Sequence, residues 1–172
     1  ETISIFEANR FLESKDEGTL DNFVPVVNEI MFDAEITIDA DTTDKYPLSR
    51  DYVVHLQGIV DRMFYEEGSY IPMELKTGLW KDYKKTMMRK EMAFYQLLFE
   101  NCPRELLETH GLDGNIPITH WGWFYPASNY VYVEPAKKGS YTSVIKGIAQ
   151  MLHSYEQGIF PTKYFARTCA SC

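Results

Sequence analysis

The sequence predicts an α/β protein in which a central mixed β-sheet is flanked by helices. Segments with the apolar spacing of helices and segments rich in β-branched and aromatic residues follow one another in the order α-β-β-β-α-β-β-α. The chain has 172 residues, of which 45% are hydrophobic and 15% aromatic. This is enough apolar material for one ordinary core and too much for a disordered chain. We therefore expect a single domain over residues 1–172.

The first half of the chain predicts one helix and three strands. Apolar residues at helical spacing indicate a helix over residues 3–14. Residues 24–38 are rich in β-branched and aromatic side chains, which is typical of a strand or a bent pair of strands. The acidic, turn-rich stretch 39–49 predicts a loop, and two more strands are expected over 52–64 and 70–77.

The second half predicts two longer helices and a pair of strands. Good helix formers with Met, Phe, Tyr and Leu at helical spacing indicate a helix over 79–100, which Cys102-Pro103 ends. The remaining expected elements are a short helical turn over 105–110, strands over 116–125 and 130–134, and a helix over 141–156. The aromatic residues Trp121, Trp123, Phe124 and Tyr125 are interpreted as core, with a stacking surface for unpaired bases as the alternative.

The charge distribution combines an acidic body with one basic stretch. Seventeen Lys and Arg against 25 Asp and Glu give a net charge of −8, which argues against a protein that coats nucleic acid through bulk positive charge. Residues 76–90 nevertheless contain six basic residues and only one acid. This stretch predicts either a single track for a phosphate backbone or an ordinary solvated helix face.

Two acids and a lysine are expected to meet on one face of the sheet. A hairpin that turns on Glu67-Gly68 would place Asp61 opposite Glu74, with Cβ atoms about 4.5–5.5 Å apart. Two carboxylates at that distance repel each other unless a cation lies between them, and a divalent metal is the natural cation for oxygen ligands. Lys76 lies two residues after Glu74 and therefore points to the same face. The alternative is an exposed ladder of weak ion pairs.

These residues stand in a run that resembles a known nuclease motif. The segment Leu56-Gln-Gly58-Ile-Val-Asp61-Arg62, a hairpin, and Met73-Glu74-Leu75-Lys76-Thr77-Gly78 together resemble the core of the PD-(D/E)XK nucleases, with the Lys-Thr-Gly ending of the RecB-like branch. The resemblance implies a restriction-endonuclease-like fold and a metal-dependent deoxyribonuclease, expected to be an exonuclease. Asp61 and Glu74 would bind Mg²⁺ or Mn²⁺, and Lys76 would assist the attacking water.

The cysteine-bearing tail over residues 158–172 extends the resemblance. Gly158-Ile-Phe160-Pro161 and Cys169-Ala-Ser-Cys172 are similar to the C-terminal end of the CRISPR-associated RecB-like iron–sulfur exonucleases of antiviral defence. The similarity implies a four-iron cluster held by Cys169 and Cys172, provided that the missing cysteines lie outside this chain. Two ligands alone are too few, so a redox pair or two idle thiols stay open. Cys102 is expected to be a core thiol.

Further residues receive weaker assignments from the same resemblance. Candidate DNA-binding residues on the helix after the motif are Lys81, Lys84, Lys85, Arg89 and Tyr95. Tyr95 is equally well interpreted as a core residue. Glu29 is a candidate supporting acid or a solvent-facing residue. Glu91 stands where the family's Q-x-x-x-Y motif has Gln, and would either repel phosphate or add a metal ligand.

The expected partner is DNA, as single strands or duplex ends, with a CRISPR adaptation, viral or repair complex as a possible setting. The first residues show neither the basic stretch nor the apolar segment of a secretory signal, and no apolar run could span a membrane, so a cytoplasmic location is expected. A second hypothesis is a weakly active or inactive nuclease-fold subunit that binds DNA ends or serves in assembly. A third, a small zinc or redox protein built on the tail, leaves the hairpin acids unused.

Overall fold

The computed structural model describes residues 2–18 and 23–159. The chain falls into two compact units, which are described separately below. The first unit comprises residues up to 36 together with 54–144, and the described part of the second comprises 37–53 and 145–159. The first unit contains most of the sheet and all the residues predicted to do chemistry, with the exception of the tail.

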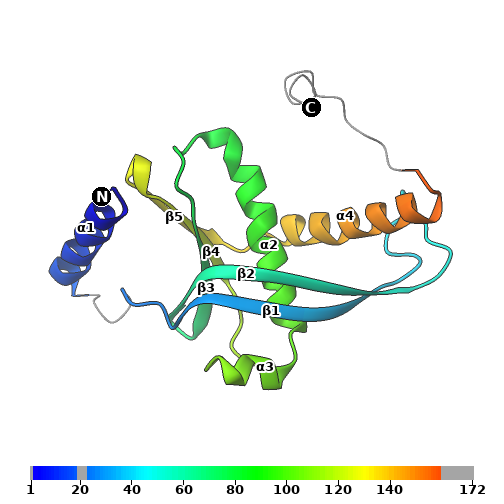
Figure 1. The fold of residues 1–172 in the computed structure, drawn as a ribbon, viewed down its shortest axis with the longest axis horizontal. Helices are drawn as coiled ribbons and strands as arrows, with labels where there is room; N and C mark the ends of the chain where they lie inside the picture. Colours follow the sequence, from blue (N-terminus) through cyan, green and yellow to red (C-terminus); the bar gives the residue numbers. More distant parts are fainter. Residues whose placement is uncertain (1, 19–22, 160–172) are drawn as a thin grey trace. The chain divides into compact units, whose positions relative to one another are not determined.

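A single five-stranded mixed sheet forms the frame of the first unit (Figure 1). The strands are adjacent in sequence order, with β2 antiparallel to β3, β3 parallel to β4, and β4 antiparallel to β5. Their bounds are β1 Val27–Ile38, β2 Tyr52–Glu66, β3 Ser69–Leu75, β4 His120–Tyr125 and β5 Tyr130–Pro135. The predicted α/β class with a mixed sheet flanked by helices is confirmed.

Helices account for most of the remaining described residues. They are α1 Thr2–Glu17, α2 Lys85–Asn101, α3 Arg104–Thr109 and α4 Lys138–Glu156, with single 3₁₀ turns η2 Asp82–Lys84 and η3 Pro126–Ser128. Among the helices of the described residues, none combines the length and the apolar character needed to cross a membrane.

The helix after the predicted motif begins six residues later than its sequence indicates. A start at Leu79 was expected, but Lys81 has extended backbone angles and α2 begins only at Lys85. Trp80 explains the delay, because its backbone N–H donates to the Ser128 hydroxyl at 2.8 Å while its ring stacks on another aromatic side chain. These long-range contacts outweigh the local helix propensity.

The hairpin between β2 and β3 has the predicted turn and register. Glu67 and Gly68 both have positive φ, at 48° and 78°, which is the backbone of a two-residue hairpin turn of type I′. The ladder pairs Glu66 with Ser69 and Arg62 with Met73. The sequence pattern therefore located the turn correctly.

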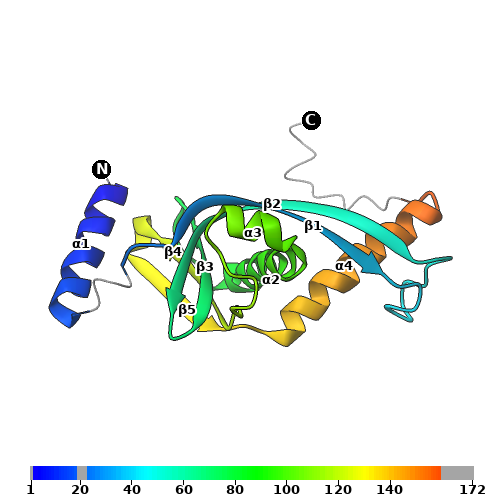
Figure 2. The same ribbon diagram turned by 90° about the horizontal axis from the view of Figure 1, so that it is seen from below.

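One face of the sheet packs against α2, which lies across the strands (Figures 1 and 2). Trp121, Trp123 and Tyr125 of β4 point to this face and are fully buried against Met88 and Met92 of α2. The interpretation of the β4 aromatic residues as core is thus confirmed for all of them, since Phe124 is equally buried on the opposite face.

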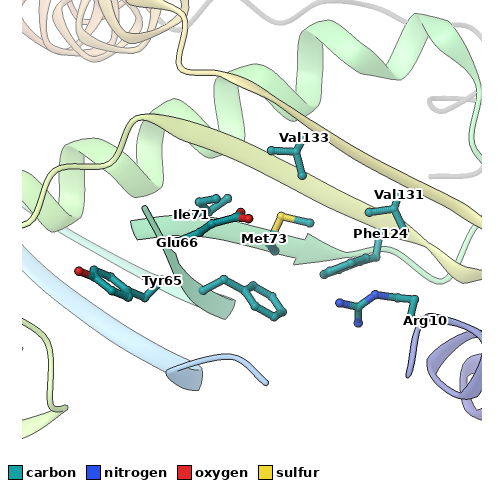
Figure 3. Close-up of a pocket in the computed structure, with 9 residues that line it drawn as sticks. Arg10, Tyr65, Glu66, Ile71, Met73, Phe124, Val131 and Val133 are labelled. Carbon is teal, nitrogen blue, oxygen red and sulfur yellow. The ribbon is translucent and has the colours of Figure 1, made fainter. Parts of the chain in front are cut away.

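The opposite face packs against α1 and leaves a shallow cavity. Phe6 of α1 contacts Phe124 edge to face, and the Arg10 guanidinium lies 4.5 Å from the centre of the Phe124 ring. Beyond Arg10 a cavity of about 150 Å³ opens over the sheet, where Val131 and Val133 of β5 stay about half exposed (Figure 3).

The second unit is held by polar contacts from a loop to α4. The Glu156 carboxylate accepts hydrogen bonds from the backbone N–H and hydroxyl of Ser49 and from the Tyr52 hydroxyl. His153 donates through Nδ1 to the Pro47 carbonyl at 2.7 Å. These bonds fix the acidic loop that the sequence predicts between β1 and β2.

The tight contact between β3 and β4 generates a stability prediction. A Cβ atom on Gly122 would lie 1.9 Å from the Met73 sulfur and 2.9 Å from the Tyr132 carbonyl oxygen, and the backbone oxygen cannot move aside. Gly122→Ala is therefore expected to lower the free energy of unfolding by about 1–3 kcal/mol or more in urea titrations. Gly147→Ala within α4, where nothing lies within 4 Å, is the control and should gain up to about 1 kcal/mol. Equal stability of Gly122→Ala and the parent protein would contradict this packing.

Candidate functional site

The two predicted acids meet at the end of the β2–β3 hairpin. Because the ladder pairs Arg62 with Met73, Asp61 and Glu74 occupy the next position along the same two strands. There the Asp61 carboxylate accepts a hydrogen bond from the Leu75 backbone N–H at 2.7 Å. This bond holds Asp61 against β3, beside Glu74.

Glu74 is a buried carboxylate whose two oxygens differ in their contacts. Its exposed fraction is only 6%, and Oε1 accepts a hydrogen bond from Lys76 Nζ at 2.6 Å. Oε2 is buried and meets no donor at full hydrogen-bond geometry among the described residues, and the Tyr95 hydroxyl is the polar group that interacts with this carboxylate from α2. Burial raises the pKa of Glu74, Lys76 opposes the rise, and the negative charges of Asp61 and Glu91 add to it.

Lys76 lies between two carboxylates. Its ammonium donates to Glu74 at 2.6 Å and to Glu91 at 2.8 Å. Burial disfavours the charged ammonium, but the hydrogen bonds to the two carboxylates outweigh burial and raise the pKa of Lys76. The Lys76 backbone N–H also donates to the Phe124 carbonyl at 2.9 Å, so the residue is anchored to β4 as well.

Glu91 brings α2 into the site in a role that the sequence did not indicate. The two sequence-based alternatives were a metal ligand and a residue that repels phosphate. In the structure Glu91 is the second ion-pair partner of Lys76. The sequence did show that Glu91 stands where the resembled motif has Gln. It could not show that Lys76 is the partner of Glu91, because the two residues meet only when α2 packs over β3.

Tyr95 lies one helical turn beyond Glu91 and is buried. Burial raises the pKa of its hydroxyl, and the charges of Glu74 and Glu91 together with a side-chain hydrogen bond to Glu74 raise it further. The phenol is thus neutral, and it lies beside the carboxylates on the side that faces the protein interior. This position is the inner helix face expected for Tyr95, and it is away from solvent.

Arg89 is engaged within the protein. Its guanidinium donates two hydrogen bonds to the Glu134 carboxylate on β5, at 2.5 and 2.6 Å. Glu134 is itself buried, and the Arg89 hydrogen bonds lower its pKa despite that burial. The charge of Arg89 is therefore largely balanced by a structural partner.

The three lysines predicted to bind DNA differ in their contacts. Lys84 Nζ donates to the Leu79 carbonyl at 2.6 Å, and Lys85 Nζ donates to the Tyr132 hydroxyl. Lys81 is exposed to solvent. All three remain near the surface of the segment that follows the motif.

Glu29 lies on β1, which β2 separates from the strand that carries Glu74. It is exposed on β1 and has a positive φ of 49°, which marks an irregularity in the strand. It is not among the groups that shift the pKa of Glu74 or Lys76. Of the two interpretations of Glu29, a supporting acid and a solvent-facing residue, the second agrees with its exposed position.

The donor set fits a single divalent cation that keeps water and substrate ligands. Within residues 2–18 and 23–159, no group of three or more His, Cys, Asp or Glu side chains gathers as a complete cage. Mg²⁺ does not require one, because it is commonly held by one or two carboxylates plus water and phosphate oxygens. The buried Glu74 carboxylate and the adjacent Asp61 carboxylate supply such a pair.

The cysteines divide between a described and an undescribed part of the chain. Cys102 is buried, and burial raises the pKa of its thiol, which confirms the expected core position. Cys169 and Cys172, predicted to hold an iron–sulfur cluster, lie outside the described residues.

No protein-family model matches the chain, and no curated protein matches it. A functional assignment therefore depends on the geometry of the described side chains and on the motif resemblance.

The Arg89–Glu134 pair generates a prediction about acid stability. Arg89→Ala removes both short hydrogen bonds from a buried carboxylate that keeps only longer contacts to Tyr132 and Lys137, and it is expected to cost about 2 kcal/mol or more in urea titrations at neutral pH. Lys90→Ala, on an exposed neighbour, is the control and should change stability by less than about 0.5 kcal/mol.

The same pair sets the sign of a pH dependence. Folding lowers the pKa of Glu134. The ionised carboxylate therefore contributes its full stabilisation of the folded protein above the unfolded-state pKa, and this stabilisation is lost as the pH falls through the folded-state pKa. The parent protein should therefore lose stability below about pH 5 more steeply than Glu134→Gln does. If the stability of both proteins falls equally steeply below about pH 5, Glu134 contributes nothing to that loss.

Proposed function

We propose that the protein is a metal-dependent DNA nuclease that hydrolyses phosphodiester bonds and acts as an exonuclease of the RecB-like type. The observation that carries the proposal is that the buried Glu74 carboxylate faces a second carboxylate, that of Asp61, while Lys76 meets only one of the Glu74 oxygens. Two carboxylates placed together repel each other, and burial adds to the cost of their charge. A divalent cation between them would offset both costs.

Each residue of the cluster has a chemical role in this proposal. Asp61 and Glu74 would hold Mg²⁺ or Mn²⁺, and the ion supplies Lewis-acid chemistry that withdraws charge from a phosphate. Lys76 orients the attacking water through a hydrogen bond and stabilises the negative charge that develops on the phosphate oxygens. Glu91 keeps the Lys76 ammonium directed into the site when Glu74 engages the cation.

The substrate is proposed from charge and from the motif resemblance. The protein is acidic overall, so a polyanion is expected to bind only along the local basic stretch, where Lys81, Lys84 and Lys85 follow the motif. Contacts of this kind read phosphates without sequence preference. A partner in a CRISPR adaptation, viral or repair complex, and a four-iron cluster on Cys169 and Cys172 with cysteines from elsewhere, belong to the same proposal.

One observation favours a second candidate, a nuclease-fold subunit that binds DNA ends and cleaves poorly. Lys76 is tied to both Glu74 and Glu91, and the resembled motif has a neutral Gln where this chain has Glu91. A second carboxylate at this point adds negative charge near the phosphate and competes for the ammonium.

The nuclease proposal is tested by digestion of end-labelled single- and double-stranded DNA with Mg²⁺, Mn²⁺ or EDTA. Asp61→Asn, Glu74→Gln and Lys76→Ala should each lower the cleavage rate at least about 100-fold, because each removes a group that touches the cation or the reacting phosphate. Lys146→Ala, at an exposed position of α4 outside the basic stretch, serves as the charge control and should cleave normally. Cleavage that survives Lys76→Ala, or that persists in EDTA, would refute the assignment.

Glu91→Gln separates the two candidates. Gln keeps an oxygen that can accept from Lys76 but removes one negative charge beside the phosphate. For a nuclease, the parent protein cleaves and the variant binds DNA severalfold more tightly in EDTA, measured by fluorescence anisotropy. Cleavage by the variant alone would identify the parent protein as a binding subunit whose Glu91 suppresses the reaction.

A further inference from the structure

A row of stacked aromatic rings begins beside the site. Trp80 stacks on Tyr130 with ring centres 4.7 Å apart and planes at 14°, and Tyr130 stacks on Tyr132 at 6.0 Å and 12°. Tyr132 in turn stacks on Trp123 at 4.9 Å. Trp123, which is paired in register with Glu74, also stacks on Trp80 at 5.9 Å and 26°, so the row closes into a four-ring cluster beside the carboxylate site.

The outer rings of this row are accessible. Trp123 is fully buried, whereas Trp80, Tyr130 and Tyr132 are partly exposed. Tyr83 of the 3₁₀ turn η2, three residues after Trp80, is 76% exposed.

Tyr83 also borders the site. Trp80 contacts the buried Tyr125 ring edge to face at 5.2 Å, and Lys84 Nζ lies 5.1 Å from the centre of the same ring. The segment that carries Tyr83 is therefore held against Tyr125 at residues 80 and 84. Burial raises the pKa of Tyr125, and the charges of Lys76, Glu91 and Glu74 also act on it. The segment that carries Tyr83 follows Lys76 by only a few residues, so a strand bound at Lys76 would meet this ring.

Positive charge accompanies the rings. Lys85 Nζ lies 4.1 Å from the centre of the Tyr132 ring, and Lys84 Nζ lies 5.1 Å from that of Tyr125. Lys81 is exposed two residues before Tyr83. Rings that stack bases, next to cations that meet phosphates, are the combination found in proteins that bind unpaired nucleic acid. The lysines favour a polyanion over a neutral ligand such as an oligosaccharide.

We propose that Tyr83, together with the outer faces of Trp80 and Tyr130, is a stacking surface for unpaired bases of the strand whose phosphate enters the Asp61–Glu74–Lys76 site. The inference rests on the proposed function for the identity of the strand. Bases in a duplex are stacked on one another and have no face to offer, so the surface selects a single strand and tolerates any sequence.

The test measures binding without cleavage, in EDTA, by fluorescence anisotropy with the full chain. The two probes are a labelled oligothymidylate and a strand of equal length made of abasic residues, which keeps the phosphates and lacks the bases. The parent protein should bind oligothymidylate more tightly, and Tyr83→Ala should weaken that binding about 5- to 100-fold while leaving the abasic strand unaffected.

Matched variants separate stacking from damage to the fold. Tyr83→Phe keeps the ring and should bind as the parent protein does. Tyr155→Ala removes a ring that is 67% exposed on α4 and should change neither affinity. Because removal of Trp80 could disturb the packing against β5, Trp80→Phe is used there, and a smaller loss than with Tyr83→Ala is expected.

Equal affinity of the parent protein for oligothymidylate and the abasic strand would overturn the inference, as would tighter binding of duplex of the same length. The readout is independent of cleavage. Base-dependent binding by a protein that cleaves under no metal would refute the nuclease alone, and metal-dependent cleavage with no base dependence would refute the stacking surface alone.

Discussion

The register of the β2–β3 hairpin is the constraint on which the rest of the site depends. Side chains alternate along a strand, so a slip of one residue would turn either Asp61 or Glu74 to the other face of the sheet. The two-residue turn at Glu67 and Gly68, with both residues at positive φ, prevents such a slip. The Asp61 carboxylate then accepts from the Leu75 backbone N–H, which makes the acid itself part of the pairing between the two strands.

Two ion pairs connect helix α2 to the strands on either side of β4, and the helix supplies the acid in one pair and the base in the other. Glu91 offers a carboxylate to Lys76 on β3, and Arg89 offers a guanidinium to Glu134 on β5. The carboxylates of Glu74 and Glu134 are both buried, so the cations that meet them offset a large cost of desolvation. Apolar packing brings α2 onto the sheet, and these contacts determine which residues of the helix face the carboxylate cluster.

Local signals in the sequence predicted the parts of the structure that local signals control. The turn at Glu67-Gly68, the facing acids and the buried aromatic residues of β4 followed from two-residue periodicity and turn chemistry. The later start of α2, the Lys76–Glu91 contact and the Arg89–Glu134 pair did not, because each joins residues that are distant along the chain and meet only after the helix docks. The stacked row that includes Trp80 and Tyr130 belongs to the same class of long-range contact.

The interlock between Met73 and Gly122 has a consequence for motion. The Met73 side chain occupies the space that a side chain at position 122 would fill, so β3 and β4 cannot slide past each other without a clash. Glu74, the next residue along β3, is therefore carried on a rigid element that has no freedom to shear. The segment 77–84 that follows is largely exposed and is anchored mainly through Trp80, so it has no comparable interlock with the sheet along the rest of its length.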